Sequence, residues 1–247
     1  TATLSAYGRY GEKMGNEYFQ LDGNASRISS NARHIGQHVR LPRPGVAIHI
    51  NAFNFPAWGA FEKMAVAFLA GMPVLTKPAE ETALLTYEMI KILVEADFLP
   101  EGSLSFLAGP PQNLIDCVKE QDVVAFTGSA STAGILRSKD SVVSSAARFN
   151  AEADSLNAAI LGVDVGVGSD IWHRFINNIV NDMTQKAGQK CTAVRRILVP
   201  DSLVEAVSEA LVERLEGTRI GYPVERSVQM GALASKKQLN SVRAGIT

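Results

Sequence analysis

Residues 46–50, VAIHI, form the first stretch of the chain with a clear structural pattern, and the residues after them decide the fold. This short run of β-favouring residues lies between Gly45 and Asn51, an arrangement typical of a strand. Apolar residues then recur at helical spacing until Gly71 ends the pattern, and residues 74–76 form a second short β-rich run. A strand, a helix and a second strand in this order predict the start of a parallel sheet.

The same alternation continues to about residue 150. We expect helices over residues 85–96, 112–120 and 129–137, and strands over residues 104–107, 122–126 and 146–150. Alternating strands and helices predict an α/β fold, in which helices cover both faces of a parallel sheet. Ligands of such sheets bind beyond the carboxyl ends of the strands. The loops expected at that edge are residues 51–56, 76–80, 109–111 and 127–129.

Two other regions complete the predicted organisation. Residues 1–40 are polar and weakly patterned, and we expect a helix there, followed by an extended arm over residues 28–41. After residue 155 the alternation of strands and helices starts again. It predicts strands over residues 158–161 and 194–199, a helix lined by Ile171, Phe175, Ile179, Met183 and Ala187, a helix with a capping box from Ser202 to Glu205, and a last helix over residues 236–244. We therefore expect two domains, residues 1–154 and 155–247, the second of them incomplete.

Composition and charge exclude several classes of protein. Of the 247 residues, 46% are hydrophobic and 20% are charged, which is ordinary for a folded chain with a real core. A net charge of −1 offers no basic surface, so neither nucleic acid nor a membrane is expected as a partner. The longest apolar run, residues 64–75, is too short to cross a bilayer. Two cysteines make no disulfide framework, which favours a reducing compartment, the cytoplasm.

Residues 187–193, AGQKCTA, carry Cys191 between a long amphipathic segment and an apolar run. A cysteine in a loop beside Gly188 and Lys190 can be an activated nucleophile, although intracellular cysteines are more often inert thiols. The direction of the Lys190 side chain is open, so we assign it no part in activating the thiol. Cys191 is therefore a candidate nucleophile whose role depends on the rest of the chain.

Polar groups elsewhere lie in surroundings that favour chemistry. Glu152 follows the strand expected over residues 146–150 and is flanked by alanines, and partial burial would tune such a carboxylate as a general base. Asp154 is two residues away and could serve instead, and an ordinary loop carboxylate is the default interpretation of both. Asn54 is an amide among aromatic residues, where it either braces a turn or donates to a bound group.

The expected sheet edge also carries candidate cofactor-binding residues, although no Gly-x-Gly-x-x-Gly motif follows the first strand. Gly128 and Ser129 open a helix whose backbone N–H groups could bind a diphosphate, or Ser129 is simply the cap of that helix. Lys77 and Glu80 follow a strand and could hold the hydroxyls of a ribose, or they form a solvated pair. The four histidines show no metal-ligand spacing, so we expect no metal.

Six short motifs occur in an order that resembles the aldehyde dehydrogenase superfamily. They are NFP at residues 54–56, TKPAE at 76–80, FTGS at 126–129, Glu152, GQKC at 188–191 and MGAL at 230–233. The resemblance implies a Rossmann-like dinucleotide-binding domain in residues 1–154 and a partial catalytic domain in residues 155–247. It implies Cys191 as the nucleophile, Glu152 as the general base, and Asn54 with the Cys191 backbone N–H as oxyanion donors. It assigns cofactor binding to Lys77, Glu80, Gly128, Ser129, Phe53 and Gly109.

Two further strings narrow the resemblance. EADSLN at residues 152–157 and KCTAVRR at 190–196 resemble the semialdehyde dehydrogenases of bacterial aerobic benzoate and phenylacetate breakdown, which act on ring-opened semialdehydes carried as coenzyme A thioesters. The implied activity is the NAD(P)-dependent oxidation of such an aldehyde to the acid, through a thiohemiacetal and a thioester on Cys191. Arg195 and Arg196 could meet coenzyme A phosphates, or could simply alternate in exposure along a strand.

The resemblance leaves several alternatives open. Glu80 suits the two hydroxyls of an NAD ribose and would repel a 2′-phosphate, so we favour NAD over NADP as the cofactor. One alternative is an enzyme that passes the acyl group to coenzyme A, against which Glu152 argues, and another is a protein that binds a dinucleotide or assembles without catalysis. Family members are longer, so we expect this chain to be a fragment that lacks both ends. Residues 25–43 fall where the family places an arm for subunit pairing, which implies a homodimer or a dimer of dimers.

Overall fold

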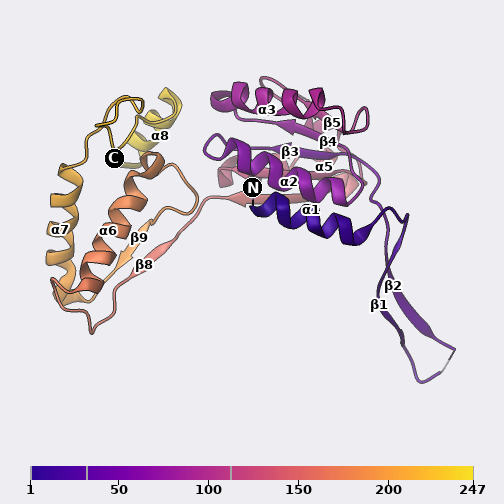
Figure 1. Ribbon diagram of the computed structural model, residues 1–247, viewed down its shortest axis with the longest axis horizontal. Helices are drawn as coiled ribbons and strands as arrows, with labels where there is room; N and C mark the ends of the chain where they lie inside the picture. The colour runs from indigo at the N-terminus through magenta and orange to yellow at the C-terminus, as the bar shows by residue number, and fades with distance from the viewer. Residues whose placement is uncertain (1, 32, 112, 247) are drawn as a thin grey trace. The chain divides into compact units, whose positions relative to one another are not determined.

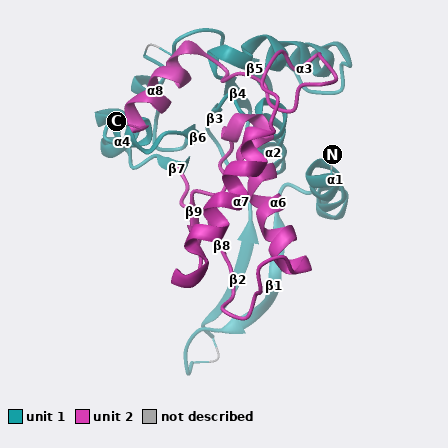
Figure 2. Cartoon of the chain, turned by 90° about the vertical axis from the view of Figure 1, so that its left-hand side faces the viewer, with its two compact units in different colours: residues 1–153 teal, residues 154–247 magenta. Residues whose placement is uncertain are grey.

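A computed structural model of the chain describes residues 2–31, 33–111 and 113–246 and divides them into two compact units. Unit 1 belongs to residues 1–153 and unit 2 to residues 154–247 (Figure 2). Each unit has a hydrophobic core of its own, and each is therefore described by itself.

A five-stranded parallel sheet forms the centre of unit 1 (Figure 1). Its strands are β3 Ala47–Ile50, β4 Val74–Lys77, β5 Leu104–Phe106, β6 Val123–Gly128 and β7 Arg148–Ala153, in the order β5-β4-β3-β6-β7. Every neighbouring pair is parallel. The predicted α/β fold with a parallel sheet is confirmed.

Helices cover both faces of this sheet. They are α2 Pro56–Leu69, α3 Ala83–Glu95, α4 Ala130–Arg137 and α5 Asp140–Ser145. Successive residues of a strand point to opposite faces. Accordingly, Ala47 belongs to the core cluster that contains Met64 of α2, whereas Ile48 belongs to the cluster that contains Ala133 of α4. The central strands are thus buried on both sides, which explains why they are short continuous apolar runs.

The register of the strands brings their loops to one edge of the sheet. Ile50, the last residue of β3, pairs with Lys77 on one side and with Phe126 on the other. On the next strands, Thr127 pairs with Glu152. Because all these strands run in the same direction, the residues that follow the pairs leave the sheet at its carboxyl edge, where ligands of such sheets bind.

Some local predictions in unit 1 are wrong. Gln112, where a helix was expected to begin, lies outside the described residues, and the rest of that segment contains a 3₁₀ turn, Ile115–Cys117, in place of the helix. Ile115 and Val118 are buried three residues apart, a spacing that one 3₁₀ turn satisfies. Strand β7 continues to Ala153, so Glu152 lies within the strand and not after it. Helix α5 escaped prediction because its serine-rich sequence lacks an apolar period.

The N-terminal part of unit 1 is a helix followed by a β-hairpin. Helix α1 covers Ala2–Met14, and the hairpin consists of the antiparallel strands β1 Gln20–Arg27 and β2 Ile35–Arg40. Figure 1 shows this hairpin extending away from the sheet of unit 1. The arm expected over residues 28–41 is therefore one strand of a pair. Strand β1 was missed because residues 22–24, DGN, disfavour strands.

Unit 2 contains a parallel strand pair flanked by helices. The strands are β8 Ala158–Ile160 and β9 Arg196–Leu198, the helices are α6 Asp170–Thr184, α7 Val204–Glu216 and α8 Lys236–Ile246, and 3₁₀ turns cover Gln185–Gly188 and Asp201–Leu203. The core of the unit forms between α6 and α7, where Trp172, Ile176 and Ile179 cluster with Val207 and Leu211.

Two predicted details of unit 2 are wrong. Ile171 is 61% exposed whereas Ile179 is 2% exposed, so the buried face of α6 does not follow the expected four-residue steps. A repeated step of four residues drifts around a helix of 3.6 residues per turn, and the buried stripe runs through Trp172, Ile176 and Ile179, at steps of four and then three residues. The capping box expected from Ser202 is also absent, because Ser202 lies in a 3₁₀ turn and α7 begins at Val204 without a side-chain cap.

The buried face of α6 can be tested with two matched substitutions. Ile179→Ala should lower the free energy of unfolding by about 2–5 kcal/mol, since it removes buried methyl groups and leaves a cavity. Ile171→Ala, on the exposed face of the same helix, should change it by less than about 0.5 kcal/mol. Urea unfolding followed by circular dichroism measures both values. Equal losses for the two variants would contradict this orientation of α6.

Candidate active site

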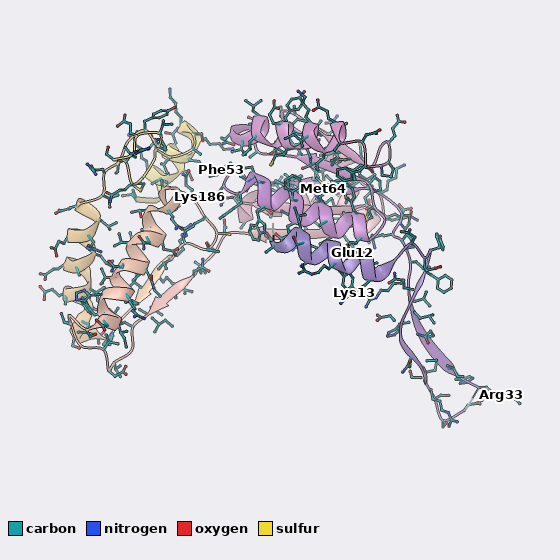
Figure 3. All side chains as sticks on the ribbon, viewed as in Figure 1. Glu12, Lys13, Arg33, Phe53, Met64 and Lys186 are labelled. Carbon is teal, nitrogen blue, oxygen red and sulfur yellow. The ribbon has the colours of Figure 1, made fainter. Side chains whose placement is uncertain are left out.

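Asn54 lies in the loop between β3 and α2, and the loop is anchored on both sides of it. Before it, the buried Asn51 donates from its side-chain amide to Thr76 Oγ1 (3.2 Å) and from its backbone N–H to the Lys77 carbonyl (3.0 Å). After it, the ring of Phe55 packs edge-to-face on Trp58 with 5.6 Å between ring centroids. Figure 3 shows the neighbouring Phe53 in this loop. Asn54 itself is half-buried.

Lys63 of α2 joins this loop to the strand beside Glu152. Its ammonium donates to Thr127 Oγ1 (2.6 Å) and to Asn51 Oδ1 (3.2 Å). Burial lowers the pKa of Lys63, and the negative charges of Glu152 and Glu62 oppose that shift. Lys63 was not among the residues predicted from the sequence, although a lysine inside the apolar run of α2 is a signal that its charge has a partner.

Glu152 points to the same face of the sheet as Thr127, because register partners on parallel strands share a face. Its side chain is exposed, so the partial burial expected for this carboxylate is wrong. The physical reason is its place on β7, the edge strand of the sheet. An exposed carboxylate at the edge of the sheet has direct access to water. Asp154, the alternative base, falls in unit 2 with φ at +54°.

His49 lies on β3, close enough to Lys63 for the charge of that lysine to affect it. It is 3% exposed, and its Nδ1 has no hydrogen-bond partner among the described residues. Burial and the positive charge of Lys63 lower the pKa of His49 from 6.5 to about 4. The imidazole is therefore neutral at pH 7, and the positive charge beside it is that of Lys63.

The candidate cofactor-binding residues lie along the carboxyl edge of unit 1. Lys77 ends β4 and is 8% exposed, while Glu80 is exposed at the start of the 3₁₀ turn Glu80–Thr82. Ser129 caps α4, since its Oγ accepts from the Thr132 N–H (3.2 Å). A Cβ on Gly128 would lie 2.5 Å from Cζ of Phe126, so this position requires glycine for packing.

Gly109 lies in the loop after β5. Its φ is +76°, which favours glycine, and the space that a side chain would occupy is open. This loop leaves the same carboxyl edge as the loops after β3, β4 and β6, because β5 is parallel to its neighbour β4.

Cys191 of unit 2 is exposed and lies just after a left-handed turn. Lys186, Ala187 and Gly188 have φ values of +52°, +52° and +70°. Beyond the turn, the Asn157 side-chain amide donates to the Cys191 carbonyl (2.5 Å) and to the Ala193 carbonyl (3.1 Å). The loop that presents the thiol is therefore held from outside.

The two lysines near Cys191 have different surroundings. Lys190 is 8% exposed, and its ammonium donates to the Asp182 carboxylate and to Gln185 Oε1 (2.9 Å), both near the end of α6. Lys186, labelled in Figure 3, is exposed; slight burial lowers its pKa, and the charge of Cys191 acts against that shift. Lys186 was not among the residues predicted from the sequence.

Arg195 and Arg196 both brace unit 2 through backbone carbonyls. The Arg195 guanidinium donates to the carbonyls of Gly188 (3.3 Å) and Lys190 (3.0 Å). The Arg196 guanidinium donates to the Leu156 carbonyl (2.7 Å). Both side chains are exposed. Exposure alternates along β9 from Arg196 to Leu198, as expected for Arg196, whereas Arg195 precedes the strand, so that interpretation is wrong for Arg195 alone.

Asn54, Glu152 and the cofactor candidates therefore belong to unit 1, and Cys191 belongs to unit 2. Within residues 2–31, 33–111 and 113–246, no three or more His, Cys, Asp and Glu side chains form a group that could hold a metal ion. None of the helices in the same ranges is long and apolar enough to span a bilayer.

Comparisons with known proteins point to one family. The profile of the aldehyde dehydrogenase family matches residues 3–247. A 3,4-dehydroadipyl-CoA semialdehyde dehydrogenase from Aromatoleum evansii is 43% identical over 244 residues, which are 99% of this chain and 47% of that protein. An alpha-ketoglutaric semialdehyde dehydrogenase from Bacillus subtilis is 31% identical over 206 residues, which are 82% of this chain and 40% of that protein.

A solved structure shares the fold. The crystal structure of betaine aldehyde dehydrogenase from Staphylococcus aureus in complex with NAD+ matches with a TM-score of 0.82 at 23% identity. The match covers 99% of this chain and 46% of that one. The chain thus spans about half the length of the relatives that it matches.

The neutral, buried His49 predicts a specific pH dependence of stability. Between pH 6.5 and about 4 the unfolded chain binds a proton at this residue and the folded chain does not, so stability falls as the pH falls through that window. The loss due to His49 should approach about 3 kcal/mol. Urea unfolding from pH 7 to pH 4 should show a shallower loss in His49→Gln. His38→Gln, at an exposed position of β2, is the control and should keep the wild-type slope. The same slope in His49→Gln as in the wild type would contradict the prediction.

Proposed function

The chain belongs to the aldehyde dehydrogenase family, and from this premise we propose that its protein oxidises an aldehyde to the carboxylic acid with NAD+ or NADP+. The observation that carries the proposal is the exposed thiol of Cys191 on a loop held by hydrogen bonds, at the position of the family motif Gly-Gln-Lys-Cys. We assign the dinucleotide to residues 1–154 and the nucleophile to residues 155–247.

Cys191 starts the proposed reaction. Its thiolate adds to the aldehyde carbon and forms a C–S bond, while the carbonyl oxygen gains the negative charge. The Asn54 side-chain amide and the Cys191 backbone N–H donate to that oxygen, and each such donor typically contributes ~3–4 kcal/mol. A bound nicotinamide dinucleotide supplies the oxidant, because it accepts a hydride.

Glu152 completes the proposed reaction by releasing the acid. The acyl group is left on Cys191 as a thioester, which needs a water nucleophile. Glu152 takes a proton from that water, the oxygen of the water bonds to the acyl carbon, and the Cys191 thiolate leaves. The exposure of Glu152 supports this role, since a base for hydrolysis must reach water.

The carboxyl edge of unit 1 fits a dinucleotide. The exposed Glu80 offers a carboxylate to ribose hydroxyls beside the strand that ends at Lys77. The start of α4, at Gly128 and Ser129, offers backbone N–H groups and the positive end of a helix dipole to a diphosphate. Phe53 and Gly109 lie in loops of the same edge, where they would contact the rest of the cofactor.

The substrate that we propose is a semialdehyde carried as a coenzyme A thioester and derived from ring cleavage of an aromatic compound. The support is 43% identity to a CoA-linked semialdehyde dehydrogenase over nearly the whole chain. We also propose a cytoplasmic enzyme that pairs through the β1–β2 hairpin in a homodimer or a dimer of dimers. The alternatives are an enzyme that transfers the acyl group to coenzyme A and a dinucleotide-binding or assembly protein without activity.

The nucleophile can be tested against the other cysteine of the chain. In the natural full-length protein, Cys191→Ala should lower kcat/KM for NAD(P)H formation by a factor on the order of 10³ or more, because no thioester can form. Cys117→Ala, at the other exposed cysteine, should leave it unchanged. The assay compares a CoA-linked semialdehyde with simple aliphatic and aromatic aldehydes. Unchanged turnover in Cys191→Ala would reject the mechanism, and an acyl-CoA product would favour the acylating alternative.

The choice of cofactor depends on Glu80 in this proposal. The Glu80 carboxylate would repel a 2′-phosphate, so wild type should prefer NAD+ and Glu80→Thr should raise the NADP+/NAD+ ratio of kcat/KM about tenfold or more. Glu81→Thr, at the next exposed carboxylate, is the matched control and should keep the wild-type ratio. A Glu80→Thr variant with the wild-type ratio would show that another residue selects the cofactor.

A further inference from the structure

Asp182, near the end of α6, holds both sides of the Cys191 loop with one carboxylate. Its Oδ1 accepts from the Lys190 ammonium, one residue before Cys191. Its Oδ2 accepts from the Val194 backbone N–H at 2.7 Å, three residues after Cys191. The two oxygens thus tie the residue before the cysteine and the chain beyond it to the same point on a helix.

Replacing Asp182 would leave a buried ammonium, that of Lys190, without its negatively charged partner. Lys190 is 8% exposed, and its ammonium also donates to Gln185 Oε1 at 2.9 Å. Without Asp182 its ammonium would be buried with one uncharged partner, which is costly. The hydrogen bond from Lys190, and then that from Val194, hold the pKa of Asp182 below its ordinary value against the effect of burial. Arg195 adds a further positive charge near this carboxylate.

The loop needs such a clamp because its entry is strained. Lys186 and Ala187 both have φ at +52°, a conformation that non-glycine residues adopt only where the surroundings enforce it. Arg195 and Asn157 also bind backbone carbonyls of the loop, at Gly188, Lys190, Cys191 and Ala193. Those bonds fix carbonyl groups, whereas the bond from Val194 to Asp182 fixes an N–H group.

We propose that Asp182 is a positioning residue for Cys191, in that its two oxygens set the direction of the Cys191 thiol and backbone N–H. This inference rests on the proposed function, in which that N–H is an oxyanion donor. A displaced donor or nucleophile loses rate steeply, by about 10²-fold for 1 Å. Asp182 acts through Lys190 and Val194 and takes no part in bond making or breaking.

Substitutions in the natural full-length protein test this role. Asp182→Asn keeps the shape of the side chain and removes its charge, so kcat should fall about ten- to a hundredfold while KM for NAD(P)+ stays within about twofold. Lys190→Met should lower kcat similarly, and the double variant should be no worse than the single ones, because the two residues act as one unit. Asp170→Asn, at an exposed aspartate on the same helix, is the control and should match wild type.

Hydrogen exchange provides a reading that needs no substrate. In Asp182→Asn the backbone amides of residues 189–194 should exchange faster, whereas those of α7 should not change. Unchanged exchange in the loop would reject the clamp, and faster exchange with wild-type kcat would reject the positioning role. If the wild type oxidises no aldehyde while the loop still loosens, the proposed function fails and the clamp stands.

Discussion

The common direction of β3, β4, β6 and β7 is the constraint on which unit 1 depends. Parallel pairing of Ile50 with Lys77 and Phe126, and of Thr127 with Glu152, makes every strand end at one edge. Residues as far apart in the chain as Asn54 and Glu152 therefore belong to the same carboxyl edge of the sheet. Lys63 reinforces this edge from α2, because a buried ammonium seeks the oxygen atoms that the strand ends supply.

Much of this architecture could be predicted from local patterns, and several of the errors come from pairing and packing that a local pattern does not contain. Strands such as β3 and helices such as α2 are indicated by the spacing of apolar residues and by the residues that end each element, which can be read from the sequence alone. The extent of β7 is different, since it depends on pairing with β6, and pairing is invisible in the sequence of one strand. The face of α6 that is buried, and the start of α7, likewise depend on how the two helices meet.

Some residues of the candidate site could likewise be predicted from the sequence, whereas others could not. Cys191, Glu152 and Asn54 were identified because their short motifs keep their order in the chain, whereas the burial of Glu152 was not predictable from its alanine neighbours. Lys63, Lys186 and Asp182 have no motif of their own. Their significance arises from interactions with residues elsewhere in the chain, such as that of Asp182 with Lys190, 8 positions away, and that of Lys63 with Thr127, 64 positions away. A single sequence carries no record of such contacts, except where a charge interrupts an apolar run.

The positions of Lys186 and Lys190 show why adjacency is a poor guide to electrostatics. Lys190 is next to Cys191, yet its ammonium forms an ion pair with Asp182, and this pair stabilises the conformation of the loop. Lys186 is five residues away, within a left-handed turn, and the charge of Cys191 acts to raise its pKa against the effect of burial. The backbone at Lys186 and Ala187, just before the cysteine loop, is strained. The hydrogen bonds that Asp182, Asn157 and Arg195 make to the loop stabilise it in this conformation.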